Sequence, residues 1–274
     1  MGQGLSRLTD MFAAGMACGF VTFAQASTMS PGAGVPEAQL LQPLSQWEVI
    51  PSDTQCKVER SYGQSATPTS VGFRESISAD SFELIVTGIG DESAVPEELD
   101  GSLNASDISI RRWSLHKTNV YKFRLTSSEM SQVAAASQVT VQVHGAPQQS
   151  FAVAGLDDFL RQLQQCTAAL RYKWHMGRAY AGEMGARGDV RSIVQAAIPA
   201  WTRTHMRSGA VQFILLVDES GKVVDCDVHG GPGAPLLEEL GCELLRREAT
   251  FQPARDARGA AMKDNYWTPF VVVP

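Results

Sequence analysis

The sequence predicts an α+β protein with two folded domains, and three observations lead to this. Hydrophobic residues recur at every second position between Trp47 and Trp174, which is typical of strands, and this stretch ends in a helical repeat. From residue 190 onward the pattern is helix, strand, strand, helix, strand. A glycine-rich stretch lies between the two patterns. We therefore expect a β-rich domain with a covering helix over 47–175, a hinge over 176–189 and an α-β-β-α-β domain over 190–274.

The composition is that of a globular chain and argues against one class of partner. The chain has 274 residues, of which 44% are hydrophobic and 19% are charged. This length can bury substantial cores without help from a metal. The 23 Lys and Arg residues against 29 Asp and Glu give a formal net charge of −6. Because binding to phosphate backbones depends on clustered basic residues, we expect no nucleic-acid partner.

The first residues predict export from the cytoplasm. Arg7 precedes an apolar run over 11–24, and Ala24-Gln25-Ala26 has the small-x-small pattern of a cleavage site. A membrane-spanning helix needs about 20 apolar residues, more than this run offers. We expect residues 1–26 to be a cleaved signal peptide, residues 27–46 to be a proline-containing tether, and the protein to be periplasmic. If the signal is not cleaved, the same run anchors the chain in the inner membrane.

The β-rich domain is predicted from alternation followed by helical spacing. Three strands are expected around the triplets Phe82, Leu84, Val86; Tyr121, Phe123, Leu125; and Val139, Val141, Val143. The acidic stretch over 91–101 predicts an exposed loop. The helix that follows places Leu156, Phe159, Leu160, Leu163, Leu170 and Trp174 at three- and four-residue spacing. This spacing gives the helix one apolar face with which to cover a sheet.

The C-terminal domain begins with a helix expected from Pro199 to Arg207. A strand with Val211, Phe213, Leu215 and Val217 on one face then runs into a turn at 218–221 and a second strand with Val224, Cys226 and Val228 on one face. This arrangement is a hairpin. A helix over 235–247 and a last strand over 266–273 complete the α-β-β-α-β order.

The cysteines fit a protein that folds in an oxidising compartment. Of the five cysteines, Cys18 lies in the predicted signal peptide, which leaves four. We expect Cys226 on its strand to pair with Cys242 on the following helix, a link worth about 3 kcal/mol in the chain-entropy model. Cys56 and Cys166 both lie on apolar faces and would then pair within the β-rich domain. This is one of the three pairings that four cysteines allow.

The sequence contains no motif that indicates a catalytic or metal site. A zinc site built on Cys226, His229 and Cys242 lacks a fourth ligand at a suitable spacing. The glycine-rich stretch after His229 is similar to the oxyanion loop of some hydrolases, but the chain has no G-x-S-x-G motif to supply their nucleophile. We expect no catalytic residues, no metal, no cofactor and no small-molecule substrate. An enzyme in the β-rich domain is the alternative that the sequence leaves open.

Residues 198–274 combine five features in a fixed order. They are the helix at Pro199, the hairpin over 217–223, the glycine-rich loop before Leu236-Leu237, the Phe251-x-Pro253-Ala254 motif with Gly259 after it, and Pro269 before the final valines. In these features the segment resembles the TonB C-terminal domain family. The resemblance implies a periplasmic domain whose last strand is a free edge that contacts outer-membrane receptors by strand addition. In that mode main-chain hydrogen bonds supply affinity and alternate side chains supply selectivity.

The resemblance also implies a binding edge and a partner. The side chains of Tyr266, Thr268, Phe270 and Val272 would choose the partner's side chains, and the partner would be a receptor segment or another periplasmic protein. Family members that transduce energy carry an inner-membrane helix and a long spacer, whereas a tether of this length reaches only about 60 Å. This departure argues against force transmission. A scaffold or self-associating module, which would form a homo-oligomer, is the other hypothesis.

Overall fold

A computed structural model describes residues 39–88, 97–105, 108–117, 120–143, 148–176, 186–197, 209–230 and 234–272. The predicted signal peptide, most of the tether, hinge residues 177–185 and the helix at Pro199 lie outside these ranges. Residues 38–274 belong to one compact unit. Within the described ranges the protein is a strand-rich α+β structure, as predicted.

Ten strands form one sheet in the β-rich part of the chain. They are β1 Gln39–Leu41, β2 Glu48–Pro51, β3 Cys56–Gln64, β4 Thr67–Glu75, β5 Ser81–Thr87, β6 Glu97–Ala105, β7 Ile108–Lys117, β8 Val120–Thr126, β9 Gln138–Val143 and β10 Gln149–Ala152. Their order is β1-β10-β9-β6-β7-β8-β5-β4-β3-β2. Neighbouring strands are antiparallel except for β1 and β10, which are parallel.

The segment between β1 and β2 joins the two ends of this order. Leu44 N–H donates to Ser61 O at 2.8 Å, and Gly63 N–H donates to Gln42 O at 2.9 Å. Pro43 lies opposite Tyr62 of β3 in an antiparallel bridge. Since β1 pairs with β10 immediately before this point, the sheet closes on itself through residues 39–51. The prediction of a tether over 27–46 is therefore wrong for residues 39–44, which the backbone bonds to β10 and β3 hold in the sheet.

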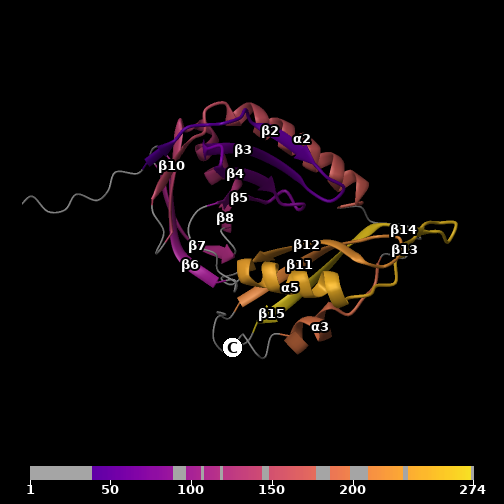
Figure 1. Cartoon of the computed structure of the whole chain (residues 1–274). Helices are drawn as coiled ribbons and strands as arrows, with labels where there is room; N and C mark the ends of the chain where they lie inside the picture. The colour runs from indigo at the N-terminus through magenta and orange to yellow at the C-terminus, as the bar shows by residue number, and fades with distance from the viewer. Residues whose placement is uncertain are drawn as a thin grey trace, which may run out of the picture. The chain divides into compact units, whose positions relative to one another are not determined.

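Two helices cover the buried face of this sheet. Helix α1 (Ser127–Ala135) begins with a capping box, in which Thr126 and Glu129 satisfy each other's backbone N–H groups. Helix α2 (Leu156–Lys173) packs across β2, β3 and β4 (Figure 1). Its buried residues, Leu156, Leu160, Leu163, Thr167 and Leu170, have the three- and four-residue spacing that predicted a covering helix.

The C-terminal part contains a second, three-stranded antiparallel sheet in the order β12-β11-β15. Its strands are β11 Gly209–Val217, β12 Val223–Gly230 and β15 Asp264–Val272. Around it lie the helices α3 Val190–Ala197 and α5 Ala234–Glu248 and a two-stranded ribbon of β13 Ala254–Arg255 and β14 Ala261–Met262. The predicted hairpin, second helix and last strand are therefore confirmed.

Strand β11 is buried on both faces. Phe213 and Leu215 belong to the core of the C-terminal part, which also contains Cys242 and Leu245 of α5. Ile214, which points the other way, belongs to the core of the ten-stranded sheet. The C-terminal sheet is thus sandwiched between its own helix and the β-rich part of the chain.

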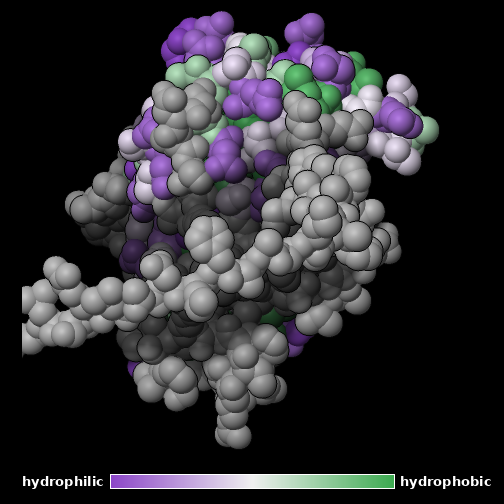
Figure 2. Space-filling view, turned by 90° about the vertical axis from the view of Figure 1, so that its left-hand side faces the viewer, coloured by the Kyte–Doolittle hydropathy of each residue, from purple (hydrophilic) through white to green (hydrophobic). Residues whose placement is uncertain are grey.

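The surface mixes polar and apolar residues. In the upper part of Figure 2 hydrophilic and hydrophobic residues alternate over short distances. The exposed large hydrophobic side chains of the described residues are Leu40, Leu44, Ile50, Tyr172, Val224 and Trp267. A search of the described helices finds none long and apolar enough to cross a membrane.

Candidate functional site

Both expected disulfides form in the structure. Cys226 of β12 pairs with Cys242 of α5 across a Cα–Cα distance of 5.4 Å. Cys56 of β3 pairs with Cys166 of α2 across 6.1 Å. Each disulfide ties a strand to the helix that covers it, so each strengthens contact between two layers.

The open edge of the three-stranded sheet is the first candidate site. Within the described ranges β15 pairs only with β11, in a register that sets Thr268 opposite Phe213 and Trp267 opposite Ile214. A strand with one unpaired side presents a row of N–H and C=O groups to which another strand can bond. The outer side of β15 is therefore available for strand addition.

The opposite edge, β12, is closed by side chains. Asp225 Oδ1 accepts a hydrogen bond from the Cys226 N–H at 2.8 Å, and Asp227 Oδ1 accepts one from the Val228 N–H at 3.0 Å. Arg124 of β8 donates to the Val228 carbonyl. These contacts occupy backbone groups that an added strand would need. On β15 the Asp264 carboxylate takes the N–H of Asn265 in the same way, so among the described residues the open part of this sheet's edges is the stretch of β15 from Trp267 onward.

The same contacts show which backbone groups of β15 point outward. In an antiparallel strand the N–H and C=O of a residue point to one side, and successive residues alternate. The N–H and C=O of Val228 point away from β11. The residue opposite it on β11, Phe213, therefore directs its own N–H and C=O toward Thr268 of β15. The outward-pointing residues of β15 are therefore Asn265, Trp267, Pro269 and Val271. Pro269, which has no N–H, stands at an outward position, where an edge strand tolerates proline.

The four residues predicted to select a partner's side chains lie on the face of β15 that looks toward α5. Phe270 is only 4% exposed and contacts Phe213 edge to face, with ring centroids 6.0 Å apart. Tyr266 packs against Phe251 at 5.1 Å. Thr268 is partly exposed, and the side chain of Val272 lies outside the described side chains. Phe270 and Tyr266 are thus packing positions in the structure, and sequence reasoning missed Trp267, which is 40% exposed on the other face.

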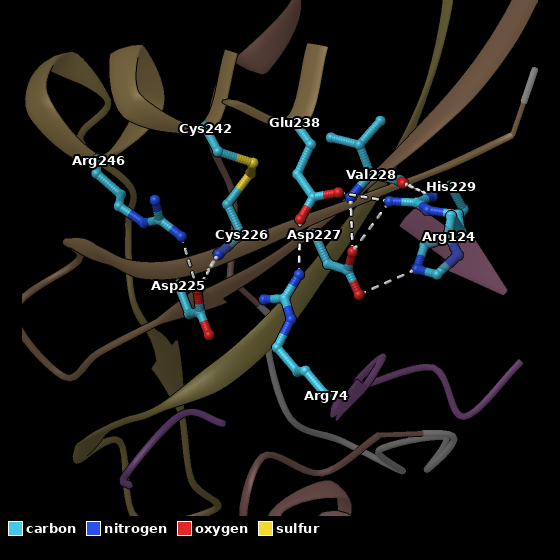
Figure 3. Close-up of a disulfide and its surroundings, with 10 residues drawn as sticks. All are labelled: Arg74, Arg124, Asp225, Cys226, Asp227, Val228, His229, Glu238, Cys242 and Arg246. Atoms are coloured by element: carbon cyan, nitrogen blue, oxygen red, sulfur yellow. Dashed lines mark hydrogen bonds and ion pairs between the residues drawn. A yellow bond between two sulfur atoms is a disulfide. The ribbon is translucent and has the colours of Figure 1, made fainter. Parts of the chain in front are cut away.

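A buried cluster of charges lies where β12 and α5 meet the outer face of the ten-stranded sheet (Figure 3). Arg74, Glu83 and Arg124 stand directly opposite one another on β4, β5 and β8. Arg74 is 2.7 Å from Glu238 of α5 and 3.1 Å from Glu83. Arg124 also pairs with Glu238 and lies 3.9 Å from Asp227. The cluster joins the two sheets through ion pairs that are largely out of contact with water.

The cluster shifts the ionisation of its members. Burial opposes the charge on Asp227, but the His229 hydrogen bond and the charges of Arg74 and Arg124 hold its pKa far below the usual range. Burial and the neighbouring charge of Glu83 raise the pKa of Glu238. Three carboxylates, those of Asp227, Glu83 and Glu238, share the two arginines, and Asp227 is the one whose ionised form is favoured most strongly.

The sequence analysis did not identify this cluster. Its signal is a charged residue at an internal strand position between apolar neighbours, as with Glu83 between Phe82 and Leu84. That signal marks an outward-facing residue, but nothing in the sequence says which outward-facing residues a second sheet will bury.

His229 borders the cluster without the geometry of a catalytic base. Its Nε2 lies 3.2 Å from Asp227 Oδ2, 3.0 Å from Ser76 Oγ and 3.1 Å from Ser78 Oγ, while its Nδ1 lies 3.2 Å from Asp80 Oδ1. Ser76 already donates to Asp227 at 2.5 Å. Each ring nitrogen thus faces a carboxylate, and the two serine hydroxyls donate to Asp227 and Asp80 rather than to the imidazole. The arrangement suits a structural clamp between β12 and the turn after β4.

An open hollow of about 590 Å³ lies between α1 and α2. Its lining consists mainly of small residues, with Leu160, Asp157, Arg161 and Gln164. This lining contains no histidine or cysteine, and we build no reaction on it. Among the described residues no group of His, Cys, Asp and Glu has the arrangement of a metal site.

Comparison with protein-family models, with curated proteins and with solved structures finds no match for this chain.

Proposed function

We propose that this protein is a periplasmic, TonB-like binding module that receives an extended segment of a partner along β15. The partner is a segment of an outer-membrane receptor. The observation that carries the proposal is the asymmetry of the three-stranded sheet, in which side chains close the β12 edge while, among the described strands, β15 pairs on one side only.

Three features support this proposal beyond the open edge. The order of strand, strand, helix and final edge strand is the one that the TonB C-terminal resemblance implies. The two disulfides fit a compartment in which disulfides persist. The β15 sheet is braced by α5 on one face and by the β-rich part on the other, so the edge is held in place before a partner arrives. Preorganisation of this kind lowers the entropic cost of binding.

The charge cluster has a supporting role in this proposal. By tying β12 and α5 to the ten-stranded sheet, Arg74 and Arg124 fix the three-stranded sheet from its closed side.

A titration followed by nuclear magnetic resonance tests the proposal. The isotopically labelled chain, with both disulfides oxidised, is titrated with peptides that copy the periplasmic N-terminal segments of outer-membrane receptors. We expect amide shifts at Trp267 and Val271, and none at Cys226 and Val228, which serve as the internal control on the closed edge. Absence of shifts along β15 with every peptide would refute strand addition.

Light scattering of the same sample distinguishes our proposal from the hypothesis of a self-associating scaffold. A mass that doubles with protein concentration in the absence of peptide, with shifts at the same β15 amides, would favour self-association. A constant monomer mass agrees with our proposal.

A further inference from the structure

We propose that Trp267 selects the partner strand by contacting an apolar, preferably aromatic, side chain on the face of the added strand that looks away from α5. This inference rests on the proposed strand addition at β15. It assigns selectivity to the row of Trp267 and Pro269 in place of the row that contains Phe270.

Two residues of the row that faces α5, Tyr266 and Phe270, have little left to offer a partner. Phe270 is buried against Phe213, and Tyr266 is held on two sides, by the ring of Phe251 and by a 3.2 Å hydrogen bond from its hydroxyl to Gly188 O. Side chains fixed in this way complete a core. They would discriminate weakly among residues that an added strand brings alongside.

On the face of β15 that looks away from α5, Asn265 already has a hydrogen-bond partner, whereas Trp267 is partly exposed. Asn265 donates from Nδ2 to Trp174 O at 2.8 Å, at the end of α2. Trp267 lies opposite the buried Ile214 on β11, so the strand on its inner side supports the indole. Its exposed area, 40% of the residue, remains for a neighbour on its outer side. An added strand would occupy that position, because cross-strand neighbours on one face lie about 4.5–5.5 Å apart.

The chemistry of an indole sets the preference. Tryptophan is among the residues enriched where a few contacts dominate binding energy, and aromatic pairs add to the gain from burial alone. Pro269, two residues further on the same face, is also exposed and apolar. A partner with a polar residue at this place would bury the indole without equivalent contact.

Pro269 favours a different protein over a second copy as the occupant. An added strand of another sequence meets one missing donor, the absent N–H of Pro269. Two copies of β15 paired about a two-fold axis would lack this donor on both strands, since the operation repeats every residue. Fewer backbone bonds per strand make the self-pair the poorer of the two complexes.

A double-mutant cycle tests the inference. The probes are two short threonine-rich peptides with lysine at both ends that differ only at the central position, which is Phe in one and Ser in the other. Affinities are measured by calorimetry for the native chain and for Trp267→Ala, with amide shifts recorded in parallel. The native chain should bind the Phe peptide about tenfold more tightly than the Ser peptide, and Trp267→Ala should lose this preference. Trp267→Phe should retain part of it.

The control variant is Val224→Ala, which removes an exposed hydrophobic side chain from β12, the closed edge, and should leave the preference unchanged. If the peptides shift the β15 amides but Trp267→Ala keeps the full preference, selection by Trp267 is refuted while strand addition stands. If neither these peptides nor receptor segments shift the β15 amides, the proposed function itself fails. Concentration-dependent dimerisation through β15 would overturn the assignment of a different protein as the occupant.

Discussion

Replacing Asp227 by Asn tests the buried charge cluster, because the amide keeps the shape, removes the charge and turns the oxygen beside Ser76 from an acceptor into a donor. Asp227 is 6% exposed and accepts hydrogen bonds from Ser76 Oγ at 2.5 Å and from its neighbour's N–H at 3.0 Å, with Arg124 3.9 Å away. Asparagine can still accept through Oδ1, so the cap on the β12 edge survives. The charges of Arg74 and Arg124 lose one of their counter-charges inside the protein.

Removing one partner from a buried ion pair costs about 3–5 kcal/mol. Glu83 and Glu238 still neutralise the arginines in the variant, so we expect the lower end, about 3 kcal/mol less free energy of unfolding at pH 7. The assay is equilibrium unfolding in urea, followed by circular dichroism, with the midpoint and slope compared between variants.

The matched control is Asp225→Asn, two residues away on the same strand. Asp225 also accepts a hydrogen bond from the N–H of Cys226, but the side chain of its ion-pair partner Arg246 is 43% exposed, about twice as much as that of Arg124. Pairs of this kind contribute about 0–1 kcal/mol. Equal losses in the two variants would refute the argument that burial makes Asp227 important.

The contribution of Asp227 to the free energy of unfolding should depend on pH. The folded-state pKa of Asp227 is depressed, so its contribution is present in full above the unfolded-state pKa of about 3.9 and is lost as the pH falls below it. The difference in unfolding free energy between the native chain and Asp227→Asn should therefore shrink below about pH 4. A difference that stays constant from pH 7 to pH 3 would contradict the ionised state assigned to Asp227.

Three further predictions concern stability. Replacing Cys226 and Cys242 together by Ser should lower the unfolding free energy by about 3 kcal/mol, measured by urea unfolding, because the disulfide closes a loop with a sequence separation of 16. Phe270→Ala should cost about 3–5 kcal/mol as a core truncation, whereas Trp267→Ala should cost less than about 2 kcal/mol, both measured by thermal unfolding. Gly221→Ala should cost more than about 2 kcal/mol by the same assay, because Gly221 has φ +84° and a Cβ there would collide with the Phe251 carbonyl.

Two of these predictions have a control. Gly259→Ala places a Cβ at φ +82° with nothing within 4 Å, so it should cost only the backbone strain of about 1 kcal/mol. Equal effects at Gly221 and Gly259 would argue against the collision. A Trp267→Ala loss as large as that of Phe270→Ala would reverse the assignment of the two faces of β15.

The sequence allowed the hairpin, both long helices and the last strand to be predicted, because each shows a period of two or of three to four residues. The closure of the ten-stranded sheet was not predicted. It depends on residues 42–44 pairing with β3, and no local pattern encodes which distant strand an irregular proline-containing segment will meet.

The candidate edge was predicted in part. The last strand and its edge position follow from the pattern and the resemblance, but the row of Tyr266 and Phe270 shares the parity of the apolar core rather than of the exposed residues. Ile214 beside Phe213 is a signal that β11 is covered on both faces, since a strand apolar at consecutive positions is buried on both sides.

Amide hydrogen exchange, read residue by residue by nuclear magnetic resonance, tests the central claim that the sheet is open at β15 and closed at β12. We predict fast exchange at Trp267 and Val271 in the free protein, slow exchange at Cys226 and Val228, and slowing at Trp267 and Val271 when a receptor segment is added. Slow exchange at Trp267 and Val271 in the free monomer, or fast exchange at Cys226 and Val228, would contradict the account.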